Sequence, residues 1–305
     1  MLEMLLEQLR SHFLRYQDLP KQVLYQDDED RDLNIFIGVK GRANYLKTTL
    51  QYFMLALSKE PKFRTKIIIV EHDKKPSLAP IAAQFDAEYI FIDNAYTNTG
   101  TEFSRSLCFN IGHAWTKEST WSLQHDCDLL VPEDFLVKLG DYMVDGVDWV
   151  QPYADKRVRM LTPQMTQYIM QKVEQLSYVS LQTINDYILY GQGATGGSLL
   201  IRNKVFEDVG GYEESFYGYA PEDSFLWTKL EAMHGTIGNG YMPHRGFGTY
   251  VNDINLYHLH HPNHWNESAR LYGMLDLYNC FCNLDYALKL KYIGMKAKQF
   301  KEAML

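Results

Sequence analysis

The stretch Thr120-Trp-Ser-Leu-Gln-His-Asp-Cys-Asp128 decides how the fold is interpreted. An apolar strand ends here in two carboxylates, Asp126 and Asp128, which are separated by one residue. In an open parallel sheet, ligands bind outside the carboxyl ends of the strands. Two carboxylates at that edge can bind one divalent cation, because Mg²⁺ and Mn²⁺ favour oxygen ligands and keep positions open for phosphate oxygens. An isolated Asp-x-Asp is also common in solvated turns, so the motif alone leaves a turn and a metal site as alternatives.

Outward from this motif, the first half of the chain alternates apolar strands with helices. Strands are predicted at 33–38, 66–71, 88–93 and 120–125, and helices at about 43–58 and 102–115. Continuous apolar strands that alternate with helices are typical of a parallel sheet covered on both faces. The sequence therefore predicts an α/β fold whose first half is of the nucleotide-binding, Rossmann-like type.

The second half has a different character. Residues 161–190 are polar and aromatic and are predicted to be helical, with no strand of their own. After the glycine cluster Gly191–Gly197, a short strand is expected at Ser198–Arg202, and helices are expected to start at Lys204 and near Glu222. No Pro- or Gly-rich linker separates the halves, so we expect one continuous catalytic unit.

Amphipathic spacing predicts helical additions at both ends of the chain. The expected organisation is an N-terminal helix with an acidic linker, a catalytic domain with a nucleotide-binding half and an acceptor half, and a C-terminal helical extension. The boundaries are 1–32 for the first part, 33–265 for the catalytic domain (33–150 and 151–265 for its halves) and 266–305 for the extension.

Two further clusters are candidates for chemistry. Glu222 and Asp223 follow Pro221 at the expected start of a helix, where the helix dipole favours ionised carboxylates. They are either helix-start residues or include a general base at a cleft. In His258-Leu-His-His-Pro-Asn-His264, the first and third histidines could reach one metal ion together. A zinc cage of four histidines is the alternative, although the stretch lacks the spacing of common zinc sites.

Composition narrows the classes of partner. The 305 residues carry a formal charge of −8, which argues against nucleic acid, since phosphate binding needs surplus Lys and Arg. Four cysteines fit a reducing compartment, so we expect a cytoplasmic protein. No apolar run approaches the ~18 residues of a membrane span. The segment Met1–Leu14 contains the charged residues Glu3, Glu7 and Arg10, so it is not expected to be a signal peptide.

The last helix has two interpretations. Its lysines form either a solvated face or a peripheral contact with the anionic inner face of a membrane. They are Lys289, Lys291, Lys296, Lys298 and Lys301.

Five blocks, in order along the chain, carry a resemblance to a known family. They are Gly38-Val-Lys-Gly-Arg42 with Tyr45-Leu46, Phe103-Ser-Arg105 through Asn110-Ile-Gly112, His125-Asp-Cys-Asp-Leu-Leu-Val-Pro132, Gly196-Gly197 through Phe206, and Gly210-Gly-Tyr-Glu-Glu-Ser-Phe-Tyr-Gly-Tyr-Ala-Pro-Glu222-Asp223. Together they resemble the GT-A fold glycosyltransferases, in particular the β-1,4-galactosyltransferases and the galactosyltransferase-like C-terminal module of bacterial family 2 glycosyltransferases. The resemblance runs from about Leu33 to Asn266.

This resemblance implies a GT-A (Rossmann-like nucleotide-diphospho-sugar transferase) fold with a mainly parallel sheet. It also implies a divalent cation, Mn²⁺ in preference to Mg²⁺, and a UDP-sugar as donor. Asp128 would bind the cation directly, Asp126 would bind it through water or lie on the ribose side, and His258 and His261 would complete its shell. The residues expected at the donor are Val39, Lys40, Arg42, Phe103, Arg105, Asp126, Cys127, Gly197 and Tyr219.

For the reaction, the resemblance implies transfer of a hexose or N-acetylhexosamine, with galactose favoured, to a saccharide or lipid-linked saccharide. Asp223 would be the catalytic base, and Glu222 would bind the acceptor or the donor sugar. Attack from the face opposite the leaving group would invert configuration. A raised pKa is expected for Asp223 because the apolar and aromatic run Phe216–Pro221 lies beside it.

Some positions depart from the family pattern. Lys40-Gly41 replaces Arg-Asn, and Tyr219-Ala220-Pro221 replaces Trp-Gly-Gly, which leaves the nucleobase pocket and the donor sugar open. The segment 150–190 has no counterpart and is expected to shape the acceptor site. Two other classes remain as alternatives: a sugar-nucleotide nucleotidyltransferase, and a non-catalytic carbohydrate-binding scaffold with the same fold.

Overall fold

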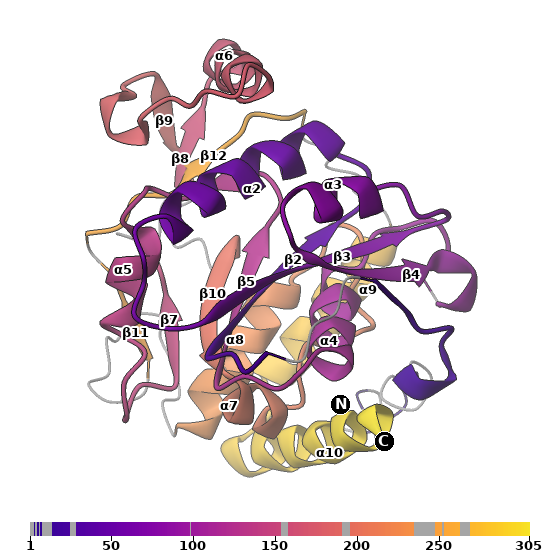
Figure 1. The fold of residues 1–305 in the computed structure, drawn as a ribbon. Helices are drawn as coiled ribbons and strands as arrows, with labels where there is room; N and C mark the ends of the chain where they lie inside the picture. Colours follow the sequence, from indigo (N-terminus) through magenta and orange to yellow (C-terminus); the bar gives the residue numbers. More distant parts are fainter. Residues whose placement is uncertain are drawn as a thin grey trace.

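A computed structural model describes residues 3, 5, 7, 14–24, 29–97, 99–153, 158–190, 196–234, 248–251, 253–262 and 269–305 of the chain. These residues form an eight-stranded sheet with helices on both faces and a four-stranded sheet at one end (Figure 1). The strand order of the large sheet is β1-β4-β3-β2-β5-β10-β7-β11. Its strands are β1 (Gln22–Leu24), β2 (Leu33–Val39), β3 (Thr65–Asp73), β4 (Glu88–Asp93), β5 (Trp121–Asp126), β7 (Trp149–Gln151), β10 (Ser198–Arg202) and β11 (Gly248–Tyr250).

Strand directions confirm the predicted α/β fold with a mainly parallel centre. The neighbours β4, β3, β2 and β5 are parallel to one another. Strand β10 is antiparallel to both β5 and β7, and β1 is antiparallel to β4. Gly38 of β2 lies opposite Asp126 of β5, so the carboxyl ends of these two strands meet at one edge of the sheet.

Helices cover both faces of the large sheet because each face of the buried strands is apolar. In β2, Ile35 and Ile37 pack with Leu46 on one face, whereas Phe36 packs with Leu107 on the other. Fully buried alternating side chains of this kind are typical of a central parallel strand. The helices of the first half are α2 (Ala43–Leu57), α3 (Ala79–Gln84), α4 (Arg105–Trp115) and α5 (Phe135–Gly140), with short 3₁₀ turns at Tyr16–Asp18 and Asn94–Tyr96.

The four-stranded sheet corrects the prediction that 161–190 is helical throughout. Its order is β6-β12-β8-β9, and its strands are β6 (Leu129–Leu130), β8 (Val158–Leu161), β9 (Tyr187–Tyr190) and β12 (Tyr257–His258). Only α6 (Pro163–Glu174) and a 3₁₀ turn at Leu181–Thr183 are helical within the segment. Tyr187-Ile-Leu-Tyr190 has the aromatic and β-branched composition of a strand. It pairs antiparallel with β8, and α6 lies in the connection between the two strands.

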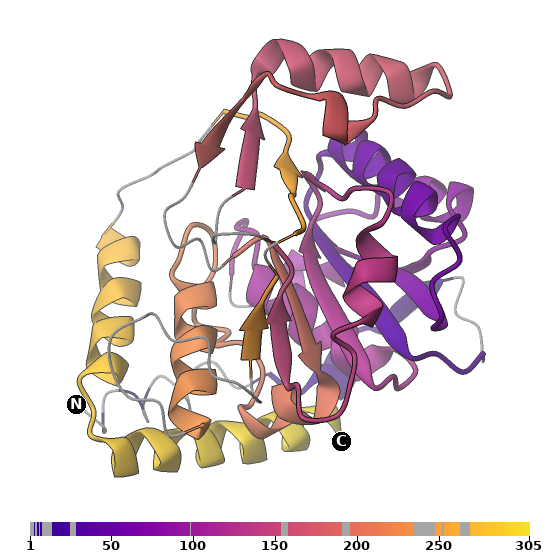
Figure 2. The same ribbon diagram turned by 90° about the vertical axis from the view of Figure 1, so that its left-hand side faces the viewer.

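The C-terminal region, expected to be helical, consists of two helices. The structure contains two helices, α9 (Ala269–Cys282) and α10 (Tyr286–Met304), after α7 (Asn203–Asp208) and α8 (Glu222–Met233). Asp285 separates them, because its side chain accepts a hydrogen bond from the Leu288 N–H and caps α10. Figure 1 and Figure 2 place α10 at the end of the molecule opposite to α6 and the small sheet.

At the N terminus, where an amphipathic helix is expected over 2–16, Glu3, Leu5 and Glu7 are helical. Residues 14 and 15 are not helical and a 3₁₀ turn begins at Tyr16, whereas the other residues of the expected helix lie outside the described residues. None of the helices that the structure describes has the length and apolar character needed to cross a membrane. In α10, Lys289 and Lys296 are buried, as are the apolar side chains of Tyr292, Ile293, Phe300 and Ala303.

Candidate active site

Three of the predicted metal ligands lie together at the carboxyl end of β5. The ligand atoms of Asp128, His258 and His261 all lie within 4.8 Å of one another. His258 Nε2 is 3.5 Å from Oδ1 of Asp128, and His261 Nε2 is 3.3 Å from Oδ2. The Asp128 side chain is only 4% exposed, so a bound cation would be largely shielded from water.

Backbone pairing explains how residues so distant in sequence meet. Strand β12 pairs with β6, which puts His258 opposite Leu129, directly after Asp128. The N–H of Leu259 donates to the carbonyl oxygen of Asp128 at 2.9 Å. The Tyr45 hydroxyl on α2 donates to the carbonyl oxygen of His260 at 3.0 Å and holds the following turn.

The orientation of the two histidines is compatible with metal binding. Nδ1 of His258 lies 2.8 Å from the Leu259 carbonyl oxygen, and Nδ1 of His261 lies 3.1 Å from that of Pro262. A ring whose Nδ1–H donates to a carbonyl presents the lone pair of Nε2, and this outer contact is typical of metal-binding histidines. One carboxylate and two such imidazoles suit Mn²⁺ or another first-row divalent ion. His260 is not part of the group, and His264 lies outside the described residues.

Arg105 connects two other predicted site residues. Its Nε donates to Oδ1 of Asp126 at 2.8 Å, and its Nη1 donates to Oδ1 of Asp223. The guanidinium is 4.7 Å from the ring centroid of Phe109 and its side chain is only 10% exposed. Asp126 is therefore paired with Arg105 and is not part of the group formed by Asp128 and the histidines.

Within the described part of the chain, Arg105 and Glu222 each keep one buried polar atom without a partner. Nη2 of Arg105 and Oε2 of Glu222 make no hydrogen bond to the described residues. Leaving such atoms buried and unpaired costs free energy, and a bound ion, water or catalytic role is one explanation for such exceptions. The two atoms fit a site that receives a polar ligand between α4 and α8.

Glu222 and Asp223 begin α8, as the sequence predicts. Burial raises the pKa of Asp223, while Arg105 acts in the opposite direction. The expected rise in pKa is thus confirmed, with burial as its cause. Burial, together with the negative charge of Asp223, raises the pKa of Glu222 well above its usual value. The backbone at Gly196, just before β10, lies so close that a Cβ atom on Gly196 would overlap with Oδ2 of Asp223.

The residues predicted at the donor cluster around the end of β2. Arg42, at the residue before α2, has a left-handed backbone (φ 51°) and donates from Nη1 to Oδ2 of Asp128. Cys127 is buried, and its carbonyl oxygen accepts from Thr49 Oγ1 at 2.8 Å. Val39 is buried at the end of the strand. Lys40 Nζ donates to the carbonyl oxygen of Thr101.

Phe103 and Tyr219 belong to the loops at the same edge. The N–H of Gly218 donates to the carbonyl oxygen of Phe103 at 2.7 Å, which joins the start of α4 to the loop before α8. Tyr219 in that loop is 51% exposed. Gly197 has φ +95°, a conformation that favours glycine, and its carbonyl oxygen accepts from the Asp126 N–H at 2.9 Å.

Three residues near the site were not predicted from the sequence. The buried Tyr153 hydroxyl donates to the carbonyl oxygen of Gly196 at 2.5 Å. His125 bridges Ser198 Oγ (2.9 Å) and the Leu129 carbonyl oxygen (2.8 Å) and so braces the turn that carries Asp128. His72 accepts from the Ser104 N–H at 3.0 Å. Burial lowers the pKa of both histidines to about 4, so both are neutral at pH 7. A polar side chain in a buried strand is the only sequence signal for either histidine.

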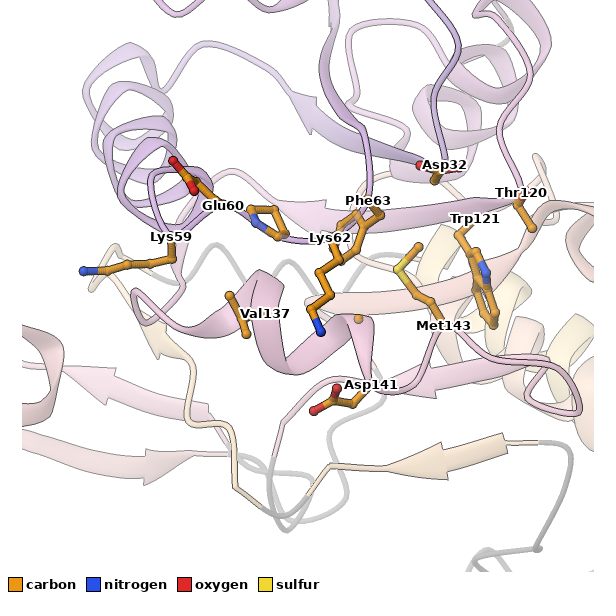
Figure 3. A pocket seen from close by; sticks show the side chains of 12 residues that line it. Asp32, Lys59, Glu60, Lys62, Phe63, Thr120, Trp121, Val137, Asp141 and Met143 are labelled. Atoms are coloured by element: carbon orange, nitrogen blue, oxygen red, sulfur yellow. The ribbon is translucent and has the colours of Figure 1, made fainter.

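Two cavities lie away from this cluster. One, of about 650 Å³, is lined by residues at the amino ends of β2 and β5, such as Asp32 and Thr120 (Figure 3). The second, of about 320 Å³, lies beside it and shares Lys59 and Val137. Lys59 is paired with Glu133 at 2.8 Å. Because ligands of open α/β sheets bind at the carboxyl ends of the strands, the Asp126–Asp128 edge is the better candidate for the active site.

Comparison with known proteins assigns the fold to a class. No protein-family model and no curated protein matches the chain. Among solved structures, the glucosyl-3-phosphoglycerate synthase of Mycobacterium tuberculosis is similar, with a TM-score of 0.50, 12% identity, and coverage of 84% of this chain and 82% of that one. A mycobacterial protein has a TM-score of 0.51, 12% identity, and coverage of 84% and 76%. The β1,4-galactosyltransferase 7 of Drosophila has a TM-score of 0.46, 12% identity, and coverage of 78% and 77%.

At these identities the comparisons bear on the fold. The chain has the GT-A fold of glycosyltransferases, as the sequence predicts.

Proposed function

We propose that the protein is a metal-dependent glycosyltransferase that moves a hexose or N-acetylhexosamine, with galactose favoured, from a UDP-sugar to a saccharide acceptor. The observation that carries the proposal is the Asp128–His258–His261 group beside the carboxylates of Asp126 and Asp223, which Arg105 joins. The fold supports it, since one similar structure is named as a glucosyl-3-phosphoglycerate synthase.

In this proposal, Asp128, His258 and His261 hold the cation. When bound, a divalent cation neutralises the charge that develops on a diphosphate leaving group. Arg42 and Arg105 lie beside the carboxylates and supply further positive charge to the diphosphate. Lys40 and Phe103 border the nucleotide, and Tyr219 contacts the sugar. These roles agree with a protein of net charge −8 that binds an anionic donor.

Asp223 is the proposed base. The acceptor hydroxyl loses its proton to Asp223 as its oxygen attacks the anomeric carbon from the face opposite the diphosphate, which inverts configuration. A raised pKa brings a carboxylate closer to the working pH and makes it a better proton acceptor. Glu222, with one unpaired oxygen, is placed to accept a hydrogen bond from a sugar hydroxyl.

Binding and turnover test this proposal separately. A thermal-shift screen of nucleotide sugars with and without Mn²⁺ should give a metal-dependent rise in Tm with a UDP-sugar, because a specific ligand stabilises the folded state by mass action. Incubation with acceptor glycosides should release UDP. Pyrophosphate release instead would indicate a nucleotidyltransferase, and binding without release would indicate a scaffold.

The Asp223→Asn variant tests the role of the base. We expect it to lose transfer by about 10²–10⁴-fold while it keeps the Mn²⁺-dependent binding of UDP. Asp145→Asn, at a fully exposed carboxylate, is the matched control and should keep both. Equal loss of binding and transfer in Asp223→Asn would contradict the assignment.

The cellular setting is a further part of the proposal. All four cysteines are free thiols, which supports a cytoplasmic location. A lipid-linked acceptor and peripheral membrane contact through α10 remain predictions. The buried lysines of α10 weigh against that contact, because Lys296 Nζ is paired with Glu213 at 3.3 Å. Flotation with anionic vesicles in low salt would test it.

A further inference from the structure

The segment 150–190 forms one side of the strand that carries His258. Strand β12 pairs on one side with β6, which directly follows Asp128. On its other side it pairs with β8, where His258 lies opposite Met160 (Figure 1). Strand β8 belongs to the segment 150–190, and α6 follows it. This segment therefore borders the candidate metal centre directly.

The second histidine of the metal group lies beyond the end of this strand. Strand β12 ends at His258, and His261 follows three residues later. Strand pairing positions His258, whereas the position of His261 depends on the backbone between the two histidines. That backbone is held at its start by Leu259, which is fully buried and donates its N–H to the carbonyl oxygen of Asp128 at 2.9 Å.

The next residue, His260, has both of its backbone polar groups bonded to side chains of other elements. Its N–H donates to Oγ1 of Thr166 on α6 at 2.8 Å. Its carbonyl oxygen accepts from the Tyr45 hydroxyl on α2 at 3.0 Å. The Tyr45 ring also lies edge-on to the His261 ring, with 6.3 Å between their centroids. Two helices thus hold the backbone immediately before His261.

Thr166 is a polar residue on an otherwise apolar side of α6. The buried residues of this helix are Thr166, Ile169 and Val173, which have the spacing of one helix face. Valine has nearly the same shape as threonine, so packing alone does not require a hydroxyl at position 166. Burial of a hydroxyl costs free energy unless it is hydrogen-bonded, and the N–H of His260 supplies that bond. The contact with His260 therefore explains the threonine.

We propose that Thr166 and Tyr45 are positioning residues of the metal centre, which hold the backbone of His260 so that the side chain of His261 reaches Asp128. This inference rests on the proposed function, which assigns His261 to the cation. A ligand on a backbone that is already ordered binds a metal ion more tightly, because less conformational entropy is lost on binding. Through α6, the segment 150–190 thereby contributes to metal affinity.

Calorimetric titration with Mn²⁺ of variants that each lose one hydroxyl tests the inference. We expect Thr166→Val and Tyr45→Phe each to weaken Mn²⁺ binding by about fivefold or more, because contacts that only support a metal ligand also tune metal affinity. Thr166→Ser keeps the hydroxyl and should bind Mn²⁺ as the wild type does. If Thr166→Ser binds as weakly as Thr166→Val, the inference is overturned, since packing of α6 and not the hydroxyl would then set the affinity.

Two matched controls lose comparable hydroxyls from α2. Thr48 is only 1% exposed, and its Oγ1 donates to the carbonyl oxygen of Asn44 at 2.7 Å. The Tyr52 hydroxyl donates to the carbonyl oxygen of Val179 at 2.7 Å. We expect Thr48→Val and Tyr52→Phe to lower Tm, because each loses a hydrogen bond, but to bind Mn²⁺ as the wild type does. Equal Mn²⁺ affinities in the controls and the two test variants would overturn the inference.

Failure of the proposed function gives a different result. The readout is Mn²⁺ affinity and not turnover, so a protein that shows the expected pattern of affinities but releases no UDP would contradict only the proposed function. A wild-type protein that binds no Mn²⁺ would contradict both the proposed function and this inference.

Discussion

At the residue scale, Gly196 is required by the position of Asp223. Its missing side chain makes room for the carboxylate, since a Cβ atom there would overlap with Oδ2 and lie 3.0 Å from Cγ. The carboxylate is the end of a flexible side chain, so an added methyl group should displace it without unfolding the protein. We expect Gly196→Ala to lose transfer by about 10²-fold or more, with a small change in Tm.

A second glycine provides the control for that prediction. Gly273 lies within α9, and a Cβ atom there would meet nothing within 4 Å. Gly273→Ala should keep activity and gain up to ~1 kcal/mol of stability from helix propensity. Steady-state kinetics and thermal unfolding measure both variants. Full activity in Gly196→Ala would show that Asp223 tolerates the shift and would weaken its assignment as base.

The histidines of the metal group allow an equally close comparison. His261 Nε2 faces Asp128, whereas the adjacent His260 contributes only backbone contacts to Thr166 and Tyr45. We expect His261→Ala to weaken Mn²⁺ binding by at least about tenfold. Substitution of a residue that only supports a metal ligand already costs about that much affinity, and loss of a ligand should cost no less. His260→Ala should bind Mn²⁺ as the wild type does. Calorimetric titration with Mn²⁺ decides, and equal affinities would exclude His261 as a ligand.

At the scale of elements, Arg159 joins three strands of the small sheet. Its Nη1 donates to the Tyr257 hydroxyl at 2.5 Å, and its guanidinium contacts the ring of Tyr187. Cation–π contacts of this kind contribute about 0.5–2 kcal/mol. We expect Arg159→Met to speed amide exchange in β9 several-fold, measured by hydrogen–deuterium exchange. Arg64→Met, at an exposed pair with Asp32, is the control and should leave β9 unchanged.

The same elements define the limit of prediction from the sequence. Strands β2 to β5 could be predicted because each is a continuous apolar run between helices. Strands β6 and β12 could not, because two residues give no periodicity and their pairing joins segments more than 120 positions apart in the chain. The resemblance implied Asp126, Asp128, His258 and His261 as the metal shell, whereas the structure brings only Asp128 and the two histidines together among the described residues, through that pairing. Arg105 was predicted near the diphosphate, but its two carboxylate partners are evident only in the structure.

At the scale of the whole molecule, the last helix supports the loop that leads to the active site. Gly210 and Gly211 have φ of +73° and +59°, and a Cβ atom on Gly210 would lie 2.5 Å from the backbone of Lys296 in α10. Lys296 pairs with Glu213 directly after this turn. The chain then continues through Tyr219 to Asp223. The C-terminal helix therefore supports the loop that leads to Asp223, the proposed base, and Lys296 takes part in that packing.

Lys229 makes this packing dependent on pH. Its Nζ is fully buried below the turn and donates to the carbonyl oxygens of Val209 and Gly211. Burial, with repulsion from Lys296, lowers the pKa of Lys229 to about 7, against 10.5 for an ordinary lysine. Between these values the unfolded chain holds a proton that the folded protein has lost. The free energy of unfolding should therefore rise as the pH increases from about 7 towards 10.

Urea unfolding at pH 7, 8 and 9 tests this coupling. We expect Lys229→Met to abolish the rise, because no group that loses its proton on folding remains at this position. Lys298→Met removes a lysine that is 79% exposed and should follow the wild-type curve. At each pH, the free energy of unfolding of one variant is subtracted from that of the other, which cancels the contribution of groups that titrate in both. A Lys229→Met protein whose stability rises with pH as steeply as that of Lys298→Met would contradict the assignment, because the pH dependence would then arise elsewhere in the molecule.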